Sequence, residues 1–388
     1  YKQDEMIPHY HARTVAAARG EGAFLLFGSA APSLETFHTA ERGAITLIRP
    51  PVSPKEREVR IVSMNKEKEL FSAELLAAIA RALKQGKRVL LAVNRRGSFQ
   101  AVLCKQCGQP LRCPHCGGNL TYDVRSAQLV CRICGTAQSR VVCPHCGSRA
   151  LRFVGVGSAR VEGEVKERFP SARVVRIDMD TLRTREQERV AERALKEEGE
   201  ILVATPMVAK GPPLPRLGLV GAIGVDALLA LPDFRAAERT YQYLTGLLGR
   251  LSPEQGSLGQ ESLAGEAIVQ THYPDHVAIL SALNGNYDRF YAAEIAERKE
   301  LFYPPFSHLA RLILSTRGRR RQKDGEERLL SFLHQFEVEI LGPAPHPTRR
   351  ACQVLLLKGR TRGAVREACA AAQQGFPRIE IDIDPERI

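Results

Sequence analysis

The chain has 388 residues, of which 44% are hydrophobic and 26% charged, enough apolar material for two or three globular domains. Lys and Arg exceed Asp and Glu by 56 to 43, and the net charge of +13 favours a polyanionic partner. No segment approaches the ~20 apolar residues that a membrane-spanning helix needs, so nucleic acid is favoured over a membrane as that partner.

The sequence begins at Tyr1 without a methionine, and its first residues resemble the middle of a domain. Whether a further segment precedes Tyr1 is therefore left open. No signal peptide is visible. Residues 23–29 (AFLLFGS) form an apolar run that predicts a buried parallel strand, and residues 33–39 predict the start of a helix. Residues 50–58 are proline-rich and charged, which is typical of a linker.

Strand and helix patterns alternate after this linker. Residues 72–84 have helical periodicity, and residues 88–93 (RVLLAV) predict a buried strand. After an interruption, further strands are predicted at 173–178, 201–205 and 219–225, with a charged helix at 184–198. The alternation predicts a doubly wound α/β domain that carries an insertion. Residues 256–265 are rich in Gly and Ser, as in a flexible loop.

The interruption contains four Cys-x-x-Cys-Gly turns, here called knuckles: Cys104/Cys107, Cys113/Cys116, Cys131/Cys134 and Cys143/Cys146. Two thiolates in one tight turn bind one tetrahedral metal ion, and the glycine supplies the positive φ of that turn. Four repeats predict two zinc sites, with redox pairs or disulfides as the weaker interpretation.

The spacing of the knuckles predicts which of them share a metal. Only five residues separate the first two, whereas fourteen separate the second from the third and alternate like a hairpin, with Leu120, Tyr122 and Val124 before the turn and Leu129 and Val130 after it. An inner cluster (Cys113, Cys116, Cys131 and Cys134) should therefore hold one zinc, and an outer cluster (Cys104, Cys107, Cys143 and Cys146) the other. Closed shells of four thiolates make both metals structural, and they leave His115 and His145 as exposed residues rather than ligands.

From residue 286 the pattern changes to a helix with Phe290, Ile295 and Leu301. Strand-like runs follow at 309–315, 354–358 and 379–383, around a helix at 364–372. These residues predict a separate small α+β domain.

Several segments together resemble the PriA family, the bacterial primosomal replication-restart helicases of superfamily 2. The resemblance rests on the eight-cysteine pattern with its nested pairing and on residues 94–97 (NRRG), 28–35 (GSAAPSLE) and 231–239 (LPDFRAAER). Shorter matches at 1–3 (YKQ), 10–13 (YHAR), 176–181 (RIDMDT), 207–211 (MVAKG) and 341–345 (LGPAP) extend it over nearly the whole chain.

The resemblance implies RecA-like helicase lobes with a two-zinc cysteine-rich insertion and a small C-terminal α+β domain. We expect residues 1–48 to be a remnant of the first lobe, 49–97 and 151–285 to form the second lobe, 98–150 to be the zinc-binding insertion and 286–388 to be the C-terminal domain.

Positions that such helicases use to hydrolyse ATP depart from the family pattern. No Gly-x-x-x-x-Gly-Lys-[Ser/Thr] loop or DEEH box occurs in these residues. The threonine of the family's SAT motif is Ala31, its Gly-His is Gly211-Pro212, and the glutamine and final arginine of its last motif are Gly246 and Pro253. Arg250 remains, as a functional remnant or as an exposed helix residue. We therefore expect that ATP hydrolysis has lapsed and that neither ATP nor Mg²⁺ is a cofactor.

The expected protein is a replication-restart factor of the bacterial cytoplasm and nucleoid that binds branched DNA, such as stalled forks and D-loops, and recruits primosome and helicase-loading proteins without helicase activity. Candidates for DNA contact are Arg95, Arg96, Lys105, Arg112, Arg125, Arg132, Arg140, Arg319, Arg320 and Arg321. Tyr122 could stack on a base, but its place in the hairpin favours packing. The resemblance also implies a site for the acidic tail of single-stranded-DNA-binding protein, for which the candidates are Lys358, Arg360, Arg362 and Arg366.

Two alternatives stay open. The first is a fragment of an active ATP-dependent 3'-5' DNA helicase, which a P-loop upstream of Tyr1 would favour. The second is a zinc-ribbon scaffold that binds proteins and little DNA. Salt-dependent binding to forked DNA separates both helicase-like readings from the scaffold, because a contact with phosphates weakens steeply with salt.

Overall fold

The computed structural model describes most of the chain, with gaps in several loops. The described residues are 2–3, 9–20, 22–49, 58–67, 69–94, 99–115, 120–123, 128–131, 134–138, 142–143, 145–154, 157–178, 181, 184–196, 200–210, 212–231, 233–251, 265–315, 327–346, 349, 352–376 and 378–386.

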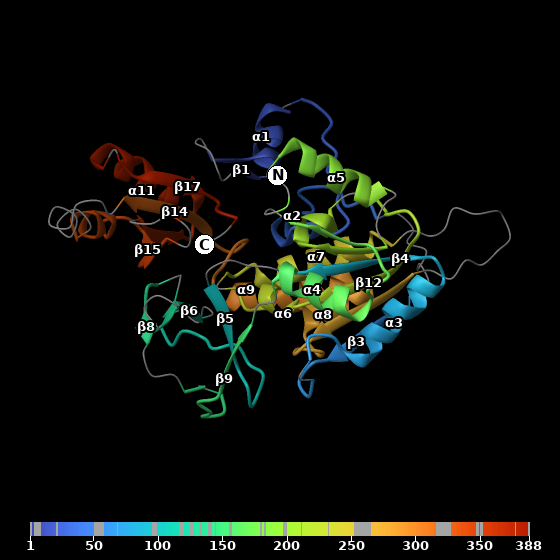
Figure 1. Ribbon diagram of the computed structural model, residues 1–388. Helices are drawn as coiled ribbons and strands as arrows, with labels where there is room; N and C mark the ends of the chain where they lie inside the picture. The colour runs from blue at the N-terminus through green and yellow to red at the C-terminus, as the bar shows by residue number, and fades with distance from the viewer. Residues whose placement is uncertain are drawn as a thin grey trace.

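A six-stranded parallel sheet is the largest element of the molecule (Figure 1). In spatial order its strands are β10 (Val174–Ile177), β11 (Ile201–Ala204), β4 (Arg88–Val93), β12 (Leu217–Ile223), β13 (Glu266–Thr271) and β3 (Glu58–Ser63). Every pairing is parallel. β4 lies inside the sheet and all six of its residues are buried, as expected for a run of apolar residues in a parallel sheet covered on both faces.

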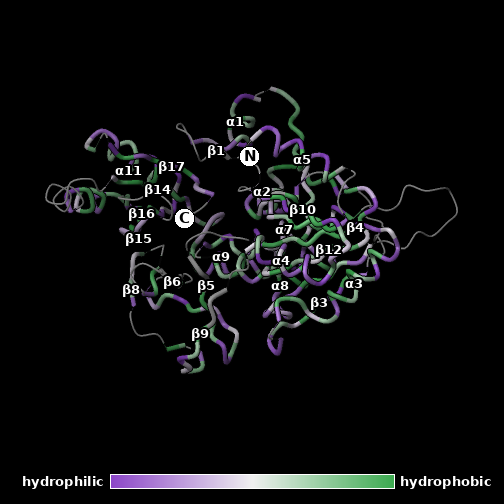
Figure 2. Tube along the Cα trace, viewed as in Figure 1, coloured by the Kyte–Doolittle hydropathy of each residue, from purple (hydrophilic) through white to green (hydrophobic). Residues whose placement is uncertain are grey.

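Helices cover both faces of this sheet. α3 (Ala73–Lys84) and α4 (Ser158–Arg168) contribute to a core with one set of strand side chains, including Leu91 and Val203. On the other face, Leu90 and Leu202 pack in a second core with residues of α5 (Arg185–Lys196), α7 (Ala236–Leu248) and α8 (Val277–Leu283). Hydrophobic residues accordingly concentrate along the strands of this sheet, whereas the helices around it alternate between hydrophobic and hydrophilic residues (Figure 2). A short helix, α6 (Asp226–Leu229), and a 3₁₀ turn, η1 (Pro206–Ala209), connect these elements.

The cysteine-rich insertion forms an antiparallel sheet between β4 and α4. Its strands, in spatial order, are β8 (Ala137–Gln138), β7 (Gln128–Cys131), β6 (Leu120–Asp123), β5 (Phe99–Cys104) and β9 (Leu151–Val154). β6 and β7 are paired as a hairpin, with Leu120 opposite Cys131 and Tyr122 opposite Leu129. The predicted hairpin is thereby confirmed, although Val124 lies outside the described residues.

The C-terminal domain is an antiparallel sheet in the order β15 (Val338–Pro345), β16 (Cys352–Gly359), β14 (His308–Ser315) and β17 (Glu380–Ile383). α11 (Arg362–Gly375) and the helical residues 327–333 pack with it around Leu312, Leu355 and Leu357. The preceding helix, α9 (Tyr287–Glu300), packs elsewhere. Its fully buried Phe290 belongs to the core of the parallel sheet and not to the core of this domain.

The N-terminal part contains β1 (Lys2–Gln3), β2 (Tyr10–His11), α1 (Ala12–Arg19) and α2 (Leu34–Glu41). α2 begins after Ser33, whose hydroxyl accepts a hydrogen bond from the Thr36 amide and caps the helix. The prediction of a buried strand at 23–29 is wrong. None of these residues pairs with a strand in the described part of the chain, and Phe24 is 89% exposed.

The predicted fold class is confirmed as a mixed α/β protein with a parallel sheet, a cysteine-rich insertion and a small antiparallel C-terminal domain. Of the helices in the described ranges, none is both long and apolar enough to cross a lipid bilayer.

Candidate metal centres and a buried ionic network

The outer cluster brings together four thiols from opposite ends of the insertion. The Sγ atoms of Cys104, Cys107, Cys143 and Cys146 all lie within 4.8 Å of one another. The Cys104 and Cys146 sulfurs are 3.4 Å apart, and the Cys107 and Cys143 sulfurs are 3.6 Å apart. In a tetrahedral site with ~2.3 Å metal–sulfur bonds the sulfurs are separated by about 3.8 Å, so four thiolates at these positions fit one zinc-sized ion.

The inner cluster has the same form where the structure describes it. The Sγ atoms of Cys113, Cys131 and Cys134 lie within 4.8 Å of one another, and Cys116 is outside the described residues. The Cys113 and Cys134 sulfurs are 3.6 Å apart. None of the described cysteines forms a disulfide. Each cluster could therefore hold one metal ion, and the nested grouping of the described thiols is the one that the knuckle spacing predicts.

Three knuckles share one backbone geometry. In each, the glycine N–H donates to the carbonyl of the first cysteine, at 3.0 Å for Gly108, 3.0 Å for Gly135 and 2.9 Å for Gly147. Each of these glycines has a positive φ, of 75°, 78° and 72° respectively. Only glycine adopts this conformation without strain, which explains why it follows every Cys-x-x-Cys pair.

The pKa values of the clustered thiols indicate that a bound cation is needed for all of them to ionise. Burial and hydrogen bonds from neighbouring thiols raise the pKa of the Cys107 thiol to about 12. Burial also acts against ionisation of Cys104, but the backbone N–H groups of Cys107 and Gln106 prevail and lower its pKa to about 6. Adjacent thiolates repel one another, so all four ionise together only when a bound cation compensates their charge. His115 and His145 are exposed, as predicted.

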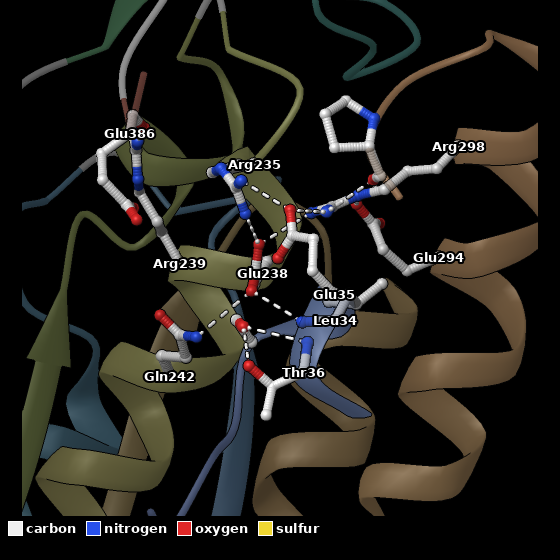
Figure 3. A network of polar contacts seen from close by, with 12 residues as sticks. Leu34, Glu35, Thr36, Arg235, Glu238, Arg239, Gln242, Glu294, Arg298 and Glu386 are labelled. Atoms are coloured by element: carbon white, nitrogen blue, oxygen red, sulfur yellow. Dashed lines mark hydrogen bonds and ion pairs between the residues drawn. The ribbon is translucent and has the colours of Figure 1, made fainter. Parts of the chain in front are cut away.

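A second polar cluster lies in the interior beside the parallel sheet. Figure 3 shows Arg235, at the start of α7, and Arg298, in α9, both pointing toward Glu35 of α2 and Glu238 of α7. Arg298 contacts Glu238 at 2.8 Å, Glu35 at 3.3 Å and Glu294 at 3.2 Å. Arg235 contacts Glu238 at 3.0 Å and also pairs with Glu35. These five residues, here called the ionic network, join three helices that are far apart in the sequence.

In the ionic network, attraction between opposite charges opposes the desolvation cost of burying them. Burial opposes the charge of Glu35, but the guanidinium groups of Arg235 and Arg298 hold the pKa of that carboxyl below its usual value. The pKa of Arg235 is raised for the reciprocal reason, because Glu35 and Glu238 outweigh the effect of burial. For Glu294 burial prevails over the attraction of Arg298, and its pKa rises to about 7.

Sequence reasoning missed Glu294 and Arg298. The available signal was their spacing: Phe290, Glu294, Arg298 and Leu301 follow one another at intervals of three or four, so the two charges lie on the face that carries the apolar residues of α9. Charged residues on an apolar stripe indicate buried partners.

The positions of the family's last helicase motif are tightly packed. A Cβ at Gly246 would lie 2.7 Å from the carbonyl oxygen of Ala209, so no larger side chain fits there without a shift of η1. Arg250 is buried, which corrects the reading of it as an exposed helix residue, and its guanidinium donates to the Pro212 carbonyl. Burial lowers the pKa of Arg250. Pro253 and Gly211 lie outside the described residues.

Most candidates for DNA contact lie outside the described residues: Arg95, Arg96, Arg125, Arg132, Arg140, Arg319, Arg320 and Arg321. Lys105 and Arg112 are described and both are exposed. Arg112 also lies 3.9 Å from Glu297 of α9. Tyr122 is half-buried and packs against the core of the cysteine-rich insertion.

The candidates for partner contact separate into two kinds. Arg360, Arg362 and Arg366 are exposed at the start of α11. Lys358 is buried, donates to the Leu301 carbonyl at 2.8 Å and lies over the Tyr303 ring at 4.6 Å, so it holds the segment after α9 against β16.

Together, the parallel sheet, the paired cysteine clusters and the antiparallel domain define an α/β lobe with a cysteine-rich insertion and a small C-terminal α+β domain. Residues 299–386 match the family model described as the primosomal protein N C-terminal domain. The chain is 35% identical to the replication restart protein PriA of Bacillus subtilis (strain 168), over 90% of this chain and 44% of that one. It is 34% identical to the PriA of Treponema pallidum (strain Nichols), over 92% and 54%, and 35% identical to that of Synechocystis, over 99% and 49%.

The chain belongs to the PriA family of replication restart proteins. It spans about half the length of these curated relatives. Among solved structures, Dbp5 of S. cerevisiae bound to RNA and ADP BeF3 matches 75% of this chain and 53% of its own length, with a TM-score of 0.31 and 13% identity.

Proposed function

We propose that this chain binds branched DNA and recruits primosome and helicase-loading proteins, and that it does so without hydrolysing ATP. The observation that carries the proposal is the packing at the last helicase motif, in a chain that belongs to a family of replication restart proteins. The net charge of +13 supports binding to a polyanion, because neutralising phosphates releases counterions. The bacterial cytoplasm and nucleoid are the compartment that this role implies.

Three positions of this chain account for the proposed lapse of hydrolysis. Where the family pattern has a glutamine, Gly246 packs directly against the Ala209 carbonyl and leaves no room for a side chain. The Arg250 guanidinium is engaged by the Pro212 carbonyl, which comes from the double-proline segment that replaces the family's Gly-His. Pro253 replaces the final arginine. In related phosphoryl-transfer sites one arginine finger is worth ~10³–10⁵ in rate, so its loss removes most of the catalysis.

The two cysteine clusters are proposed to hold one zinc ion each. Four thiolates close the shell, so the metal supplies stability to the insertion and not Lewis-acid chemistry. Contact with DNA then falls to the protein's own side chains. The knuckles fix the sheet of the insertion, in which β5 pairs with β9. The exposed Lys105 and Arg112 of the insertion are available there for contact with phosphates.

The exposed Arg360, Arg362 and Arg366 are proposed to contact the acidic tail of single-stranded-DNA-binding protein. Arg362 is 52% exposed and lies 3.5 Å from Asp384, a weak surface pair that an acidic peptide could replace. Lys358 is assigned a structural role instead, because its ammonium is buried against Leu301 and Tyr303.

The proposal is tested by titrating the full chain against forked and linear duplex DNA at several salt concentrations, together with an ATPase assay. We expect tighter binding to the fork, a logarithm of affinity that falls by ~0.9 per phosphate contact per decade of salt, and no DNA-stimulated hydrolysis. Stimulated ATP turnover would support the alternative of an active helicase. Binding that is weak and insensitive to salt would support a protein-binding scaffold.

Matched charge reversals locate the DNA surface. Lys105→Glu removes an exposed cation of the insertion, whereas Lys166→Glu makes the same change on α4, where the lysine is 55% exposed and pairs with Glu162 at 2.8 Å. We expect Lys105→Glu to weaken fork binding and flatten the salt dependence, and Lys166→Glu to do neither. Equal losses in both variants would show that net charge alone drives binding.

A further inference from the structure

The two cysteine clusters contact different neighbours. In the outer cluster, the position of a Cβ at Gly108 lies 4.0 Å from the carbonyl oxygen of His272, just after β13 of the parallel sheet. In the inner cluster, the Gly135 knuckle contacts the C-terminal domain. A Cβ at Gly135 would lie only 2.3 Å from the carbonyl oxygen of Pro343, a distance that real side chains essentially never show.

The C-terminal domain meets this knuckle with an irregular part of β15. The pairing of β15 with β16 shifts register between Leu341 and Ala344, so Gly342 and Pro343 depart from the regular ladder. Such an interruption lets a strand direct backbone groups toward another element. Here the Pro343 carbonyl is directed at the knuckle, and the Cβ position of Gly135 is also 3.5 Å from the Ala344 Cα.

A side chain of β15 adds to the contact between the C-terminal domain and the insertion. Ile340 packs in the core of the C-terminal domain, whereas its neighbour Leu341 packs against the core of the cysteine-rich insertion. This alternation is the ordinary result of a strand covered on both faces. β15 is therefore shared between two cores. Figure 1 shows it beside β6 and β8 of the insertion.

The position of the Gly135 knuckle depends on the inner cluster. Its ends are held by the Cys131 N–H, which donates to the Thr136 carbonyl at 2.8 Å, and by the Cys131 and Cys134 thiols. Without a metal ion no metal–sulfur bonds tie Cys131 and Cys134 to Cys113, and only backbone hydrogen bonds hold the shape of the knuckle. The close fit to Pro343 then loses its main support.

We propose that the inner cysteine cluster is a metal-dependent joint that sets the position of the C-terminal domain. A metal at Cys113, Cys131 and Cys134 fixes the Gly135 knuckle against Pro343, and its loss releases β15 from the insertion. The outer cluster lacks this contact with the C-terminal domain among the described residues. The proposal rests on the assignment of a metal to the inner cluster, but it is independent of DNA binding.

Two glycine substitutions test the joint in the full chain. Gly135→Ala and Gly147→Ala introduce the same left-handed strain, because both glycines have φ above 70° in equivalent knuckles. Only Gly135 faces another element, since nothing lies within 4 Å of the Cβ position at Gly147. With two metal ions retained in each variant, we expect amide hydrogen exchange in β15 to accelerate about tenfold in Gly135→Ala and to stay unchanged in Gly147→Ala. Equal effects, or none, would overturn the joint.

A second pair of variants applies the test from the other side and covers the case in which Gly135→Ala loses its metal. Leu341→Ala changes no knuckle residue and removes side-chain contacts with the insertion and with the cluster of Tyr303, Leu309 and Leu356, whereas Ile340→Ala removes a contact within the C-terminal core. We expect Leu341→Ala alone to accelerate exchange in the segment from Gln128 to Gln138 while both metals stay bound. Unchanged exchange there would refute the proposal, whatever the outcome of the DNA titrations.

Discussion

Glu294 is the residue of the ionic network whose charge is least well compensated. Its pKa of about 7 exceeds the usual value of 4.5, because burial outweighs the attraction of Arg298. The folded protein therefore favours the protonated form. The stability that this carboxyl contributes is fully present below pH 4.5 and is lost as the pH rises through 7.

We predict that Glu294→Gln makes the protein more stable than the parent at pH 8, by on the order of 1–3 kcal/mol, and leaves it equal at pH 4.5. Glutamine reproduces the neutral acid, so the variant avoids the cost of a buried negative charge. Urea unfolding at both pH values measures the difference. Glu300→Gln, an exposed change on the same helix, is the control and should show no pH-dependent gain. A stability difference that shrinks toward high pH would contradict the assignment.

The thiolates also allow a prediction for a single residue. Cys131 is fully buried and belongs to the inner cluster, so Cys131→Ser should release one of two bound zinc ions. The binding energy of a metal site mainly supports its own module, so the parallel sheet should stay folded. Metal analysis after aerobic purification gives the stoichiometry, with Cys352→Ser, outside both clusters, as the control. Retention of two ions by Cys131→Ser would exclude it as a ligand.

Helix α7 contains Gly246 at a position that helix propensity does not explain, and packing does. Alanine is favoured over glycine in a helix by about 1 kcal/mol. At Gly246, however, a Cβ would press against the Ala209 carbonyl, whereas at Gly163 in α4 nothing lies within 4 Å. The same substitution therefore has opposite consequences in the two helices.

We predict that Gly163→Ala stabilises the protein by about 0.5–1 kcal/mol and that Gly246→Ala destabilises it by about 1–3 kcal/mol. Thermal or urea unfolding of both variants beside the parent is the measurement. If Gly246→Ala were as stabilising as Gly163→Ala, the contact between α7 and η1 would be looser than described, and a glutamine could be accommodated there.

How well an element could be predicted depends on whether its pattern is local. The runs at 88–93 and 201–205 became β4 and β11 because unbroken apolar residues suit an interior parallel strand. The equally apolar run at 23–29 did not become a strand, because a strand also needs a hydrogen-bonded neighbour, and none of the described residues pairs with it. β3 was missed because Arg60 interrupts its apolar pattern, and β13 was missed because its short apolar run lies between Glu266 and Gln270. Arg60 and Glu266 contact each other at 2.7 Å.

The metal clusters and the ionic network differ in the same way. Spacing alone grouped the cysteines, since a knuckle and a hairpin are short-range features. The network requires Glu35, Glu238 and Arg298 to meet from segments separated by about 200 and 60 positions, and no local pattern encodes that meeting. The resemblance at residues 28–35 and 231–239 included Glu35, Arg235 and Glu238, but it marked neither Glu294 nor Arg298.

At the scale of the whole molecule, the parallel sheet and the metal clusters have separate cores. Neither core of the sheet contains a cysteine, whereas the core of the insertion is built around cysteines of both clusters. We predict that a strong chelator unfolds the insertion and leaves the main cooperative transition of the sheet in place. Circular dichroism melts with and without chelator measure this, with re-added zinc as the control. Loss of all secondary structure on chelation would show that the sheet depends on the metals.

The edge strand β3 has a consequence for the order in which the chain is assembled on the ribosome. Its sole sheet neighbour among the described residues is β13, and Glu58 pairs with Glu266, more than 200 positions later. Contacts of such high sequence separation form late, because a long loop must close first. All strand pairings of the cysteine-rich insertion lie within residues 99–154. The insertion can therefore finish folding before the last strands of the parallel sheet have been synthesised. A nascent chain should therefore acquire its metals before its largest domain is finished, and the unpaired edge of β3 is the part that needs protection in the meantime.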